Sequence, residues 1–119
     1  MKGMPTYHWD SVEKEQMNPH LVRQVIHGDH MTIARLELKK GAFVPQHSHH
    51  NEQVSMVQSG RIKFNLDGVE HTVGAGETVR IPPNVPHFVE VIEDCVVLDL
   101  FSPRREDWIR GDDAYLRAK

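Results

Sequence analysis

The sequence predicts an all-β domain, and three observations support this prediction. Short apolar or alternating runs recur along the chain, which is the pattern of half-buried strands. Glycine, proline, asparagine and aspartate residues separate these runs, as expected for turns. No long segment shows helical periodicity before residue 103. Many short, evenly spaced strands are typical of a sandwich or a barrel.

The expected strands follow one another through the middle of the chain. They are residues 21–28, 31–38, 43–49, 53–58, 61–66, 69–73, 78–81, 87–92 and 95–101. The Asp-Gly pair at residues 67–68 is a hairpin signal, and we expect further turns at residues 59–60 and 93–94. Residues 105–119 are expected to hold a short helix and a tail. We also expect residues 5–12 to add an edge strand, to this subunit or to a neighbouring one.

Composition limits the kind of protein this is. A chain of 119 residues is expected to form a single domain, residues 1–119. Its net charge of −3 and its lack of a basic run argue against nucleic-acid binding. No apolar run is long enough to span a membrane, and the N-terminus lacks the apolar stretch of a secretory signal. The single cysteine, Cys95, excludes an internal disulfide, so we expect a cytoplasmic protein in which Cys95 is a small buried hydrophobe.

Three histidines and a glutamine have spacings that suit one metal ion. His47 and His49 point to the same face of an extended segment, because side chains alternate along a strand. Gln53 follows at another even offset, whereas His87 must arrive from a distant strand. His50 has the opposite parity to His49 and is expected outside the site. Three imidazole nitrogens and one amide oxygen suit a borderline divalent transition metal.

The segments around these residues resemble the two motifs of the cupin superfamily, at about residues 41–60 and 76–91. The motif residues are Gly41, His47, His49, Gln53 and Gly60 in the first, and Gly76, Pro82, Asn84 and His87 in the second. The resemblance covers about residues 31–101. It implies a double-stranded β-helix, the jelly-roll barrel of RmlC-like cupins, with a metal ion inside its mouth. It also implies a homodimer, the common assembly of the family.

Two positions depart from the usual cupin pattern. Gln53 stands where cupins usually carry glutamate, and Asn84 stands where they often carry glycine. The second change is mild, because asparagine tolerates a left-handed backbone. The first leaves the ion with its full double positive charge, which favours a small anionic or sugar-like substrate and stronger Lewis acidity. Zinc, nickel, iron, manganese, cobalt and copper all accept this ligand set.

A second group of residues narrows the range of possible functions. Asp99 and Phe101 share strand parity with Val97, and Arg105 follows them. This segment resembles that of the cupin enzymes acting on 4,5-unsaturated monouronates from pectin and alginate breakdown. By that resemblance Asp99 transfers a proton, Phe101 forms a wall for the sugar and Arg105 clamps the uronate carboxylate, which suits its planar fork. The implied reaction converts the cyclic unsaturated uronate to its linear keto form.

Each of these residues also has a structural interpretation. Asp99 could pair with Arg104 or Arg105 in a salt bridge, and Phe101 could be ordinary core. Arg105 could be structural as well. Trp108 is expected to cover the outer sheet or an intersubunit surface.

Other function classes stay open beside the uronate enzyme. One is a metal-dependent dioxygenase resembling the quercetinase-like cupins, and a polyketide cyclase is a further enzyme of this kind. The last is a non-enzymatic sugar-binding or sensing module. The sequence favours the enzyme classes together over the binding module.

Overall fold

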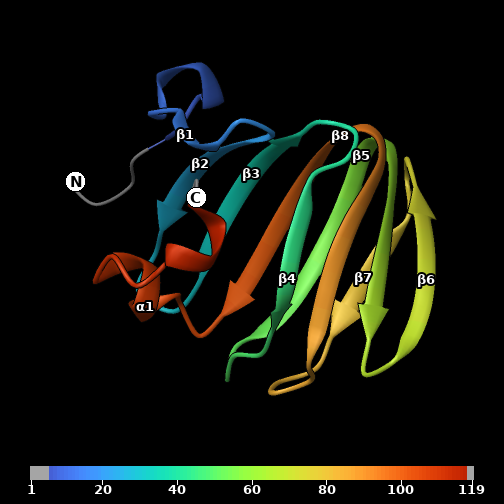
Figure 1. Ribbon diagram of the computed structural model, residues 1–119. Helices are drawn as coiled ribbons and strands as arrows, with labels where there is room; N and C mark the ends of the chain where they lie inside the picture. Colours follow the sequence, from blue (N-terminus) through green and yellow to red (C-terminus); the bar gives the residue numbers. More distant parts are fainter. Residues whose placement is uncertain (1–5, 118–119) are drawn as a thin grey trace.

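The computed structural model describes residues 6–117, which form an antiparallel eight-stranded sheet with short helical turns at either end (Figure 1). The elements are η1 (Trp9–Ser11), β1 (Glu15–Asn18), β2 (Leu21–His27), β3 (Thr32–Leu38), β4 (Phe43–His47), β5 (Glu52–Leu66), β6 (Val69–Gly74), β7 (Thr78–Ile81), β8 (His87–Ser102), α1 (Glu106–Ile109) and η2 (Ala114–Leu116). None of the helices in this range has the length and apolar character needed to cross a membrane.

Two long strands, β5 and β8, hold the barrel together. They pair with each other along most of their length, while β6 and β7 pair with different parts of β5. The two halves of β8 likewise pair with β4 and with β3. Figure 1 shows the C-terminal half of β8 lying beside β3. The all-β jelly roll and the short helical segment at its C-terminal end confirm the fold predicted from the sequence.

The turns expected at residues 59–60 and 93–94 are wrong, because the chain runs through both positions in strand. Gly60 lies within β5 at a φ of 81°, where the register with β8 shifts. A Cβ at Gly60 would collide with the Asp94 carbonyl oxygen and with Cys95 on β8. The glycine therefore allows two backbones to approach at a bulge, a role that its sequence context does not distinguish from a turn.

Side chains alternate between the two faces of β8, so every second one points to the barrel interior. Val97, Asp99 and Phe101 are all buried, and so is His87 at the start of the strand. The same inward face carries the apolar side chains of the core. Cys95 is among them, and burial raises the pKa of its thiol to about 11. The barrel interior is thus largely apolar and carries polar groups from both ends of β8, His87 at its start and Asp99 near its end.

The N-terminal edge strand expected at residues 5–12 is wrong for the part that the structure describes. Pro5 lies outside the described residues, residues 6–8 are irregular, and Trp9–Ser11 form the 3-10 turn η1. His8 Nδ1 accepts a hydrogen bond from the Asp10 backbone N–H at 3.2 Å, which favours a turn over an extended chain. The edge strand is instead β1, which the alternation pattern did not reveal because it has only four residues.

Candidate metal centre and its pocket

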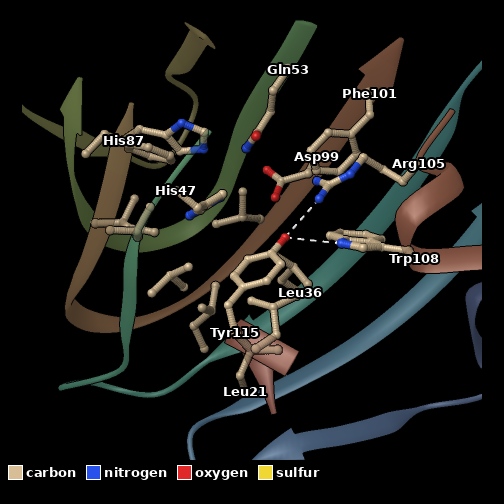
Figure 2. Close-up of a pocket in the computed structure, with 17 residues that line it drawn as sticks. Leu21, Leu36, His47, Gln53, His87, Asp99, Phe101, Arg105, Trp108 and Tyr115 are labelled. Atoms are coloured by element: carbon tan, nitrogen blue, oxygen red, sulfur yellow. Dashed lines mark hydrogen bonds between the residues drawn. The ribbon is translucent and has the colours of Figure 1, made fainter. Parts of the chain in front are cut away.

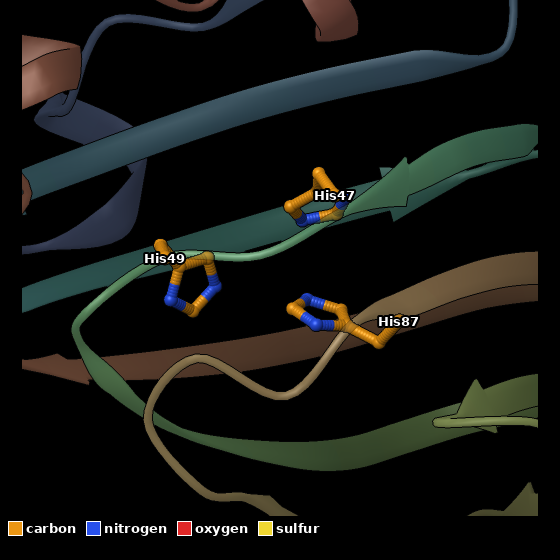
Figure 3. A group of neighbouring side chains, drawn as sticks. All are labelled: His47, His49 and His87. Carbon is orange, nitrogen blue, oxygen red and sulfur yellow. The ribbon is translucent and has the colours of Figure 1, made fainter.

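Three histidines meet at one end of the barrel (Figure 3). His47 ends β4 and is paired in register with His87, which begins β8, while His49 lies in the connection to β5. Their candidate ligand atoms all lie within 4.8 Å of one another. The ring centroids of His47 and His87 are 4.2 Å apart, and those of His49 and His87 are 5.1 Å apart. His50 is exposed to solvent, as its parity predicted.

A backbone carbonyl orients each of these rings. Nδ1 of His47 lies 2.8 Å from the Pro45 oxygen, and Nδ1 of His87 lies 2.9 Å from the Val85 oxygen. Nδ1 of His49 lies 3.0 Å from the backbone oxygen of Asn51. A carbonyl only accepts hydrogen bonds, so each Nδ1 carries the proton and each Nε2 keeps a lone pair. This is the arrangement in which a protein presents imidazole to a metal.

Two features of the described residues fit a cation at this point. His87 Nε2 is buried and has no hydrogen-bond partner within residues 6–117, although such atoms are normally satisfied. Gln53 Oε1 lies 3.1 Å from His49 Nε2, so two lone pairs face each other. This separation matches neighbouring ligands of an octahedral ion, which are about 3 Å apart when each bond is about 2.1 Å. The nitrogen and oxygen donors suit a divalent transition metal.

The histidines are held in their neutral form. Burial lowers the pKa of His47 and of His49 to about 4, and for His49 the positive charge of Arg105 adds to the effect. Burial likewise lowers the pKa of His87. Neutral imidazole is the form that binds metal, so the three rings are ready for a cation at neutral pH.

Asp99 lies on the same inner face and is joined to the glutamine through one hydroxyl. Gln53 Nε2 donates to Ser55 Oγ at 2.9 Å, and Ser55 Oγ donates to Asp99 Oδ1 at 2.6 Å. Burial raises the pKa of Asp99 to about 6, against the opposing effects of the Ser55 hydrogen bond and the charge of Arg105. A carboxyl that titrates near neutrality can both accept and return a proton.

Arg105 is buried, and its guanidinium forms an ion pair with the Asp107 carboxylate. Its Nε and Nη2 donate to the two carboxylate oxygens of Asp107 at 3.0 and 2.8 Å. The guanidinium lies over the rings of Phe101, at 4.7 Å from the centroid, and Trp108, at 4.3 Å. Nη1 makes no hydrogen bond within residues 6–117. The salt bridge considered for Asp99 is absent from these residues, because Arg105 pairs with Asp107 instead.

The segment after β8 forms a wall of the pocket (Figure 2). Trp108 is buried against Phe101, with ring centroids 5.1 Å apart, so its expected place on the outer sheet is wrong. The Tyr115 hydroxyl accepts hydrogen bonds from Arg105 Nη2 at 2.9 Å and from Trp108 Nε1 at 3.1 Å. Asn18 holds this segment in place, because its Nδ2 donates to the Leu116 carbonyl oxygen at 2.9 Å.

The pocket itself is a cavity of about 50 Å³ that brings most of the predicted site residues together. Its polar lining consists of His47, Gln53, His87, Asp99, Arg105 and Tyr115, and Phe101 and Trp108 supply aromatic walls. His49 is not among the lining residues, and its ring centroid lies 5.7 Å from that of Phe101. Sequence reasoning missed Ser55 and Tyr115. Ser55 shares strand parity with Gln53, which was the one signal that could have revealed it.

Comparison with known proteins agrees with this architecture. The chain is 25% identical to the pectin degradation protein KdgF of Dickeya dadantii over 84% of its own length and 94% of the relative. The structure of KdgF from Halomonas sp. superposes with a TM-score of 0.81 at 25% identity, covering 87% of this chain and 99% of that one. An RmlC-like cupin from Shewanella frigidimarina reaches a TM-score of 0.83 at 30% identity, covering 89% and 96%. The pattern of the cupin domain matches residues 34–101, which is more than half of the chain, so this protein belongs to the cupin family.

Proposed function

We propose that this cupin is a metal-dependent enzyme that opens 4,5-unsaturated uronate sugars to their linear keto form. The observation that carries the proposal is the position of Asp99, a buried carboxyl on the same inner face as Gln53 and beside the three-histidine cluster. Similarity to proteins named for pectin degradation supports it, since galacturonate is the sugar of pectin. The small anionic substrate also agrees with the chemistry of the pocket.

The proposed metal ligands are His47, His49, His87 and Gln53. When bound there, a divalent ion would supply a Lewis acid that polarises an oxygen of the substrate. All four ligands are neutral, so the ion's double positive charge would remain to attract a carboxylate. The buried Nε2 of His87, which has no hydrogen-bond partner among the described residues, supports this assignment more strongly than any other atom.

Asp99 is proposed to move the protons of the reaction. Opening the cyclic hemiacetal removes a proton from the anomeric hydroxyl and breaks the bond between the anomeric carbon and the ring oxygen. The bonding pair stays on the former ring oxygen as an enolate, which becomes a ketone when the neighbouring alkene carbon takes up the same proton. No atom is gained or lost, so one carboxyl that accepts a proton and returns it is sufficient. The pKa of about 6 suits Asp99 to both steps at neutral pH.

The substrate carboxylate is proposed to meet Arg105 Nη1 and the Tyr115 hydroxyl. The Tyr115 oxygen already accepts two hydrogen bonds, so its own proton is free to point into the cavity. The cavity of about 50 Å³ is far smaller than the ~300 Å³ of a typical ligand pocket. Entry of a sugar acid therefore requires some of the side chains that line the cavity to move.

The test is direct. Purified protein, loaded with zinc, nickel, manganese or iron, is incubated with 4,5-unsaturated galacturonate, and the ultraviolet absorbance of the conjugated alkene is followed. We expect the absorbance to fall faster than in buffer, and faster than with protein treated with a chelator. Equal rates with protein and with buffer for every metal would overturn the proposal. Sugar binding without turnover would instead favour a binding or sensing module.

The apolar lining at the inner end of the cavity supports a second candidate function. Leucine, isoleucine, valine and phenylalanine side chains form it, including Leu36, Ile62 and Phe64. Such a lining suits an aromatic substrate, as in a metal-dependent dioxygenase or a polyketide cyclase. Oxygen consumption with flavonols or catechols would distinguish the dioxygenase from the ring-opening enzyme, which uses no oxygen.

The assembly and the location of the protein also belong to this proposal. The family resemblance implies a homodimer, and the single buried cysteine agrees with a reducing cytoplasm. Sedimentation of the purified protein tests the first expectation. A monomer at all concentrations would contradict it.

A further inference from the structure

Ser55 lies between Gln53, a candidate metal ligand, and Asp99, and it is hydrogen-bonded to both. It follows Gln53 by two residues on β5, so both side chains point to the barrel interior, and it is paired in register with Asp99 on β8. Its side chain is fully buried. We propose that Ser55 is a positioning residue that decides which end of the Gln53 amide faces the metal. This inference rests on the metal centre of the proposed function, but not on its substrate.

The polarity of the hydrogen bonds carries the argument. The Asp99 carboxylate can only accept, so the single hydroxyl proton of Ser55 is directed to it, at 2.6 Å. Ser55 Oγ is then left as an acceptor toward Gln53, and it receives the Gln53 amide N–H at 2.9 Å. The amide oxygen must therefore point the other way, toward His49 Nε2 at 3.1 Å. The orientation of the ligand is thus set by Asp99 through one hydroxyl.

Without this control the amide has a competing orientation. If it turned over, its N–H groups would face His49 Nε2, which holds a lone pair and could accept a hydrogen bond. That arrangement would satisfy the metal-free site and present donors where a cation should bind. Ser55 disfavours it, because its proton is already committed to Asp99 and the inverted Gln53 oxygen would face an acceptor.

A glutamate at this position would not need such control. Both oxygens of a carboxylate accept, so either one can face the ion, whereas only one end of an amide can. Gln53 is the residue at which this chain departs from the usual cupin pattern. The departure therefore creates a dependence on Ser55 that a glutamate ligand would lack.

This contrast defines the experiment. Zinc affinity is measured with a chromophoric chelator as competitor for four proteins: wild type, Ser55→Ala, Gln53→Glu, and the double variant. We expect Ser55→Ala to weaken zinc binding by about 10- to 100-fold in the glutamine background, which is typical of residues that orient a metal ligand. In the glutamate background the same substitution should change affinity by less than about 3-fold. Equal losses in both backgrounds would mean that Ser55 acts through general stability, and would overturn the inference.

If Ser55→Ala fails to fold, a second variant can test the same inference. Asp99→Leu removes the acceptor at similar volume, which frees the Ser55 proton to meet the Gln53 oxygen. We expect it to weaken zinc binding in the glutamine background and to have little effect with Gln53→Glu. Unchanged affinity in the glutamine background would contradict the polarity argument.

These outcomes are separable from the ring-opening reaction. Background-dependent zinc affinity in a protein without uronate activity would support the role of Ser55 while removing the proposed substrate. Failure of the wild-type protein to bind zinc at all would overturn the metal centre and the inference together.

Discussion

The Tyr115 hydroxyl and Arg105 Nη2 are joined by a hydrogen bond of 2.9 Å, so a residue near the end of the chain shapes the pocket. Together with Asp107, Tyr115 fixes the guanidinium of Arg105, a residue that lines the cavity. Because the tyrosine oxygen is fully used as an acceptor, its proton is available to a ligand. The pair therefore forms a candidate carboxylate-binding corner.

Substitution of Tyr115 tests this corner. Tyr115→Phe removes one donor to the substrate and leaves the ring in place against His47, whose centroid is 4.7 Å away. We expect KM for unsaturated galacturonate to rise about 5-fold with kcat nearly unchanged, since one hydrogen bond is worth roughly 1 kcal/mol. Steady-state kinetics measures both constants. Tyr7→Phe, at an exposed position, is the matched control, and an unchanged KM for Tyr115→Phe would exclude this contact.

Asp99 should control the chemical step. We expect Asp99→Asn, assayed at saturating metal, to lower kcat about 100-fold or more, which is the usual contribution of a proton-transfer group. The ultraviolet assay provides the measurement. Asp112→Asn changes an exposed carboxylate and should leave kcat unaltered. Full activity of Asp99→Asn would remove this residue from the mechanism.

Metal binding should stabilise the folded protein through His87. Zinc at 100 times its Kd is expected to raise the free energy of unfolding of the wild-type protein by about 2.7 kcal/mol. His87→Ala should abolish most of that gain, because the variant loses the ligand atom that is buried without a partner in the described residues. Thermal unfolding with and without zinc checks both statements. His71→Ala, at an exposed position, should respond to zinc as the wild type does.

Acid should destabilise the metal-free protein. The pKa values of His47 and His49 fall from 6.5 to about 4 on folding, so the unfolded chain binds more protons between these values. Their contribution to stability is complete above pH 6.5 and decreases as the pH falls toward 4. Asp99 acts in the opposite direction, because its pKa rises from 3.8 to about 6 on folding, and its ionisation destabilises the fold as the pH rises. The histidines outnumber it, so the net effect is a loss in acid.

Urea unfolding in the presence of a chelator, at pH 7 and at pH 5, measures this balance. We expect lower stability at pH 5, and a steeper loss for Asp99→Asn, which lacks the opposing carboxyl. Greater stability of the wild-type protein at pH 5 would show that the histidines are not buried as described.

Two glycines with similar backbone angles should differ in their tolerance of a side chain. Gly60 and Gly41 have φ values of 81° and 87°, but only Gly60 has neighbouring atoms in the path of a Cβ. Gly41→Ala should cost about 1 kcal/mol from backbone strain alone. Gly60→Ala should cost at least about 2 kcal/mol more, because β5 and β8 must separate. Equal losses in denaturant unfolding would show that the close approach of the strands contributes nothing.

The sequence predicted the main features of the fold because local alternation and motif spacing carry them. The even spacing of His47 and His49 anticipated two rings on one side of the chain. The meeting of Ser55 with Asp99 was not predictable, because it depends on the register between two strands far apart in the sequence. Tyr115 lies in the three-residue 3-10 helix η2, which is too short to show periodicity, so nothing local marked it. Gly60 was misinterpreted because bulges and turns require the same backbone angle.

The wall that carries Arg105, Trp108 and Tyr115 follows the last strand of the barrel, beyond the residues that match the cupin domain. The candidate metal ligands therefore belong to one part of the chain, and several of the residues proposed to contact a substrate belong to another. A designer can exchange residues 103–117 for a different sequence and retain the ligands on β4, β5 and β8. Substrate selectivity can then be changed by exchanging this short segment between cupin barrels.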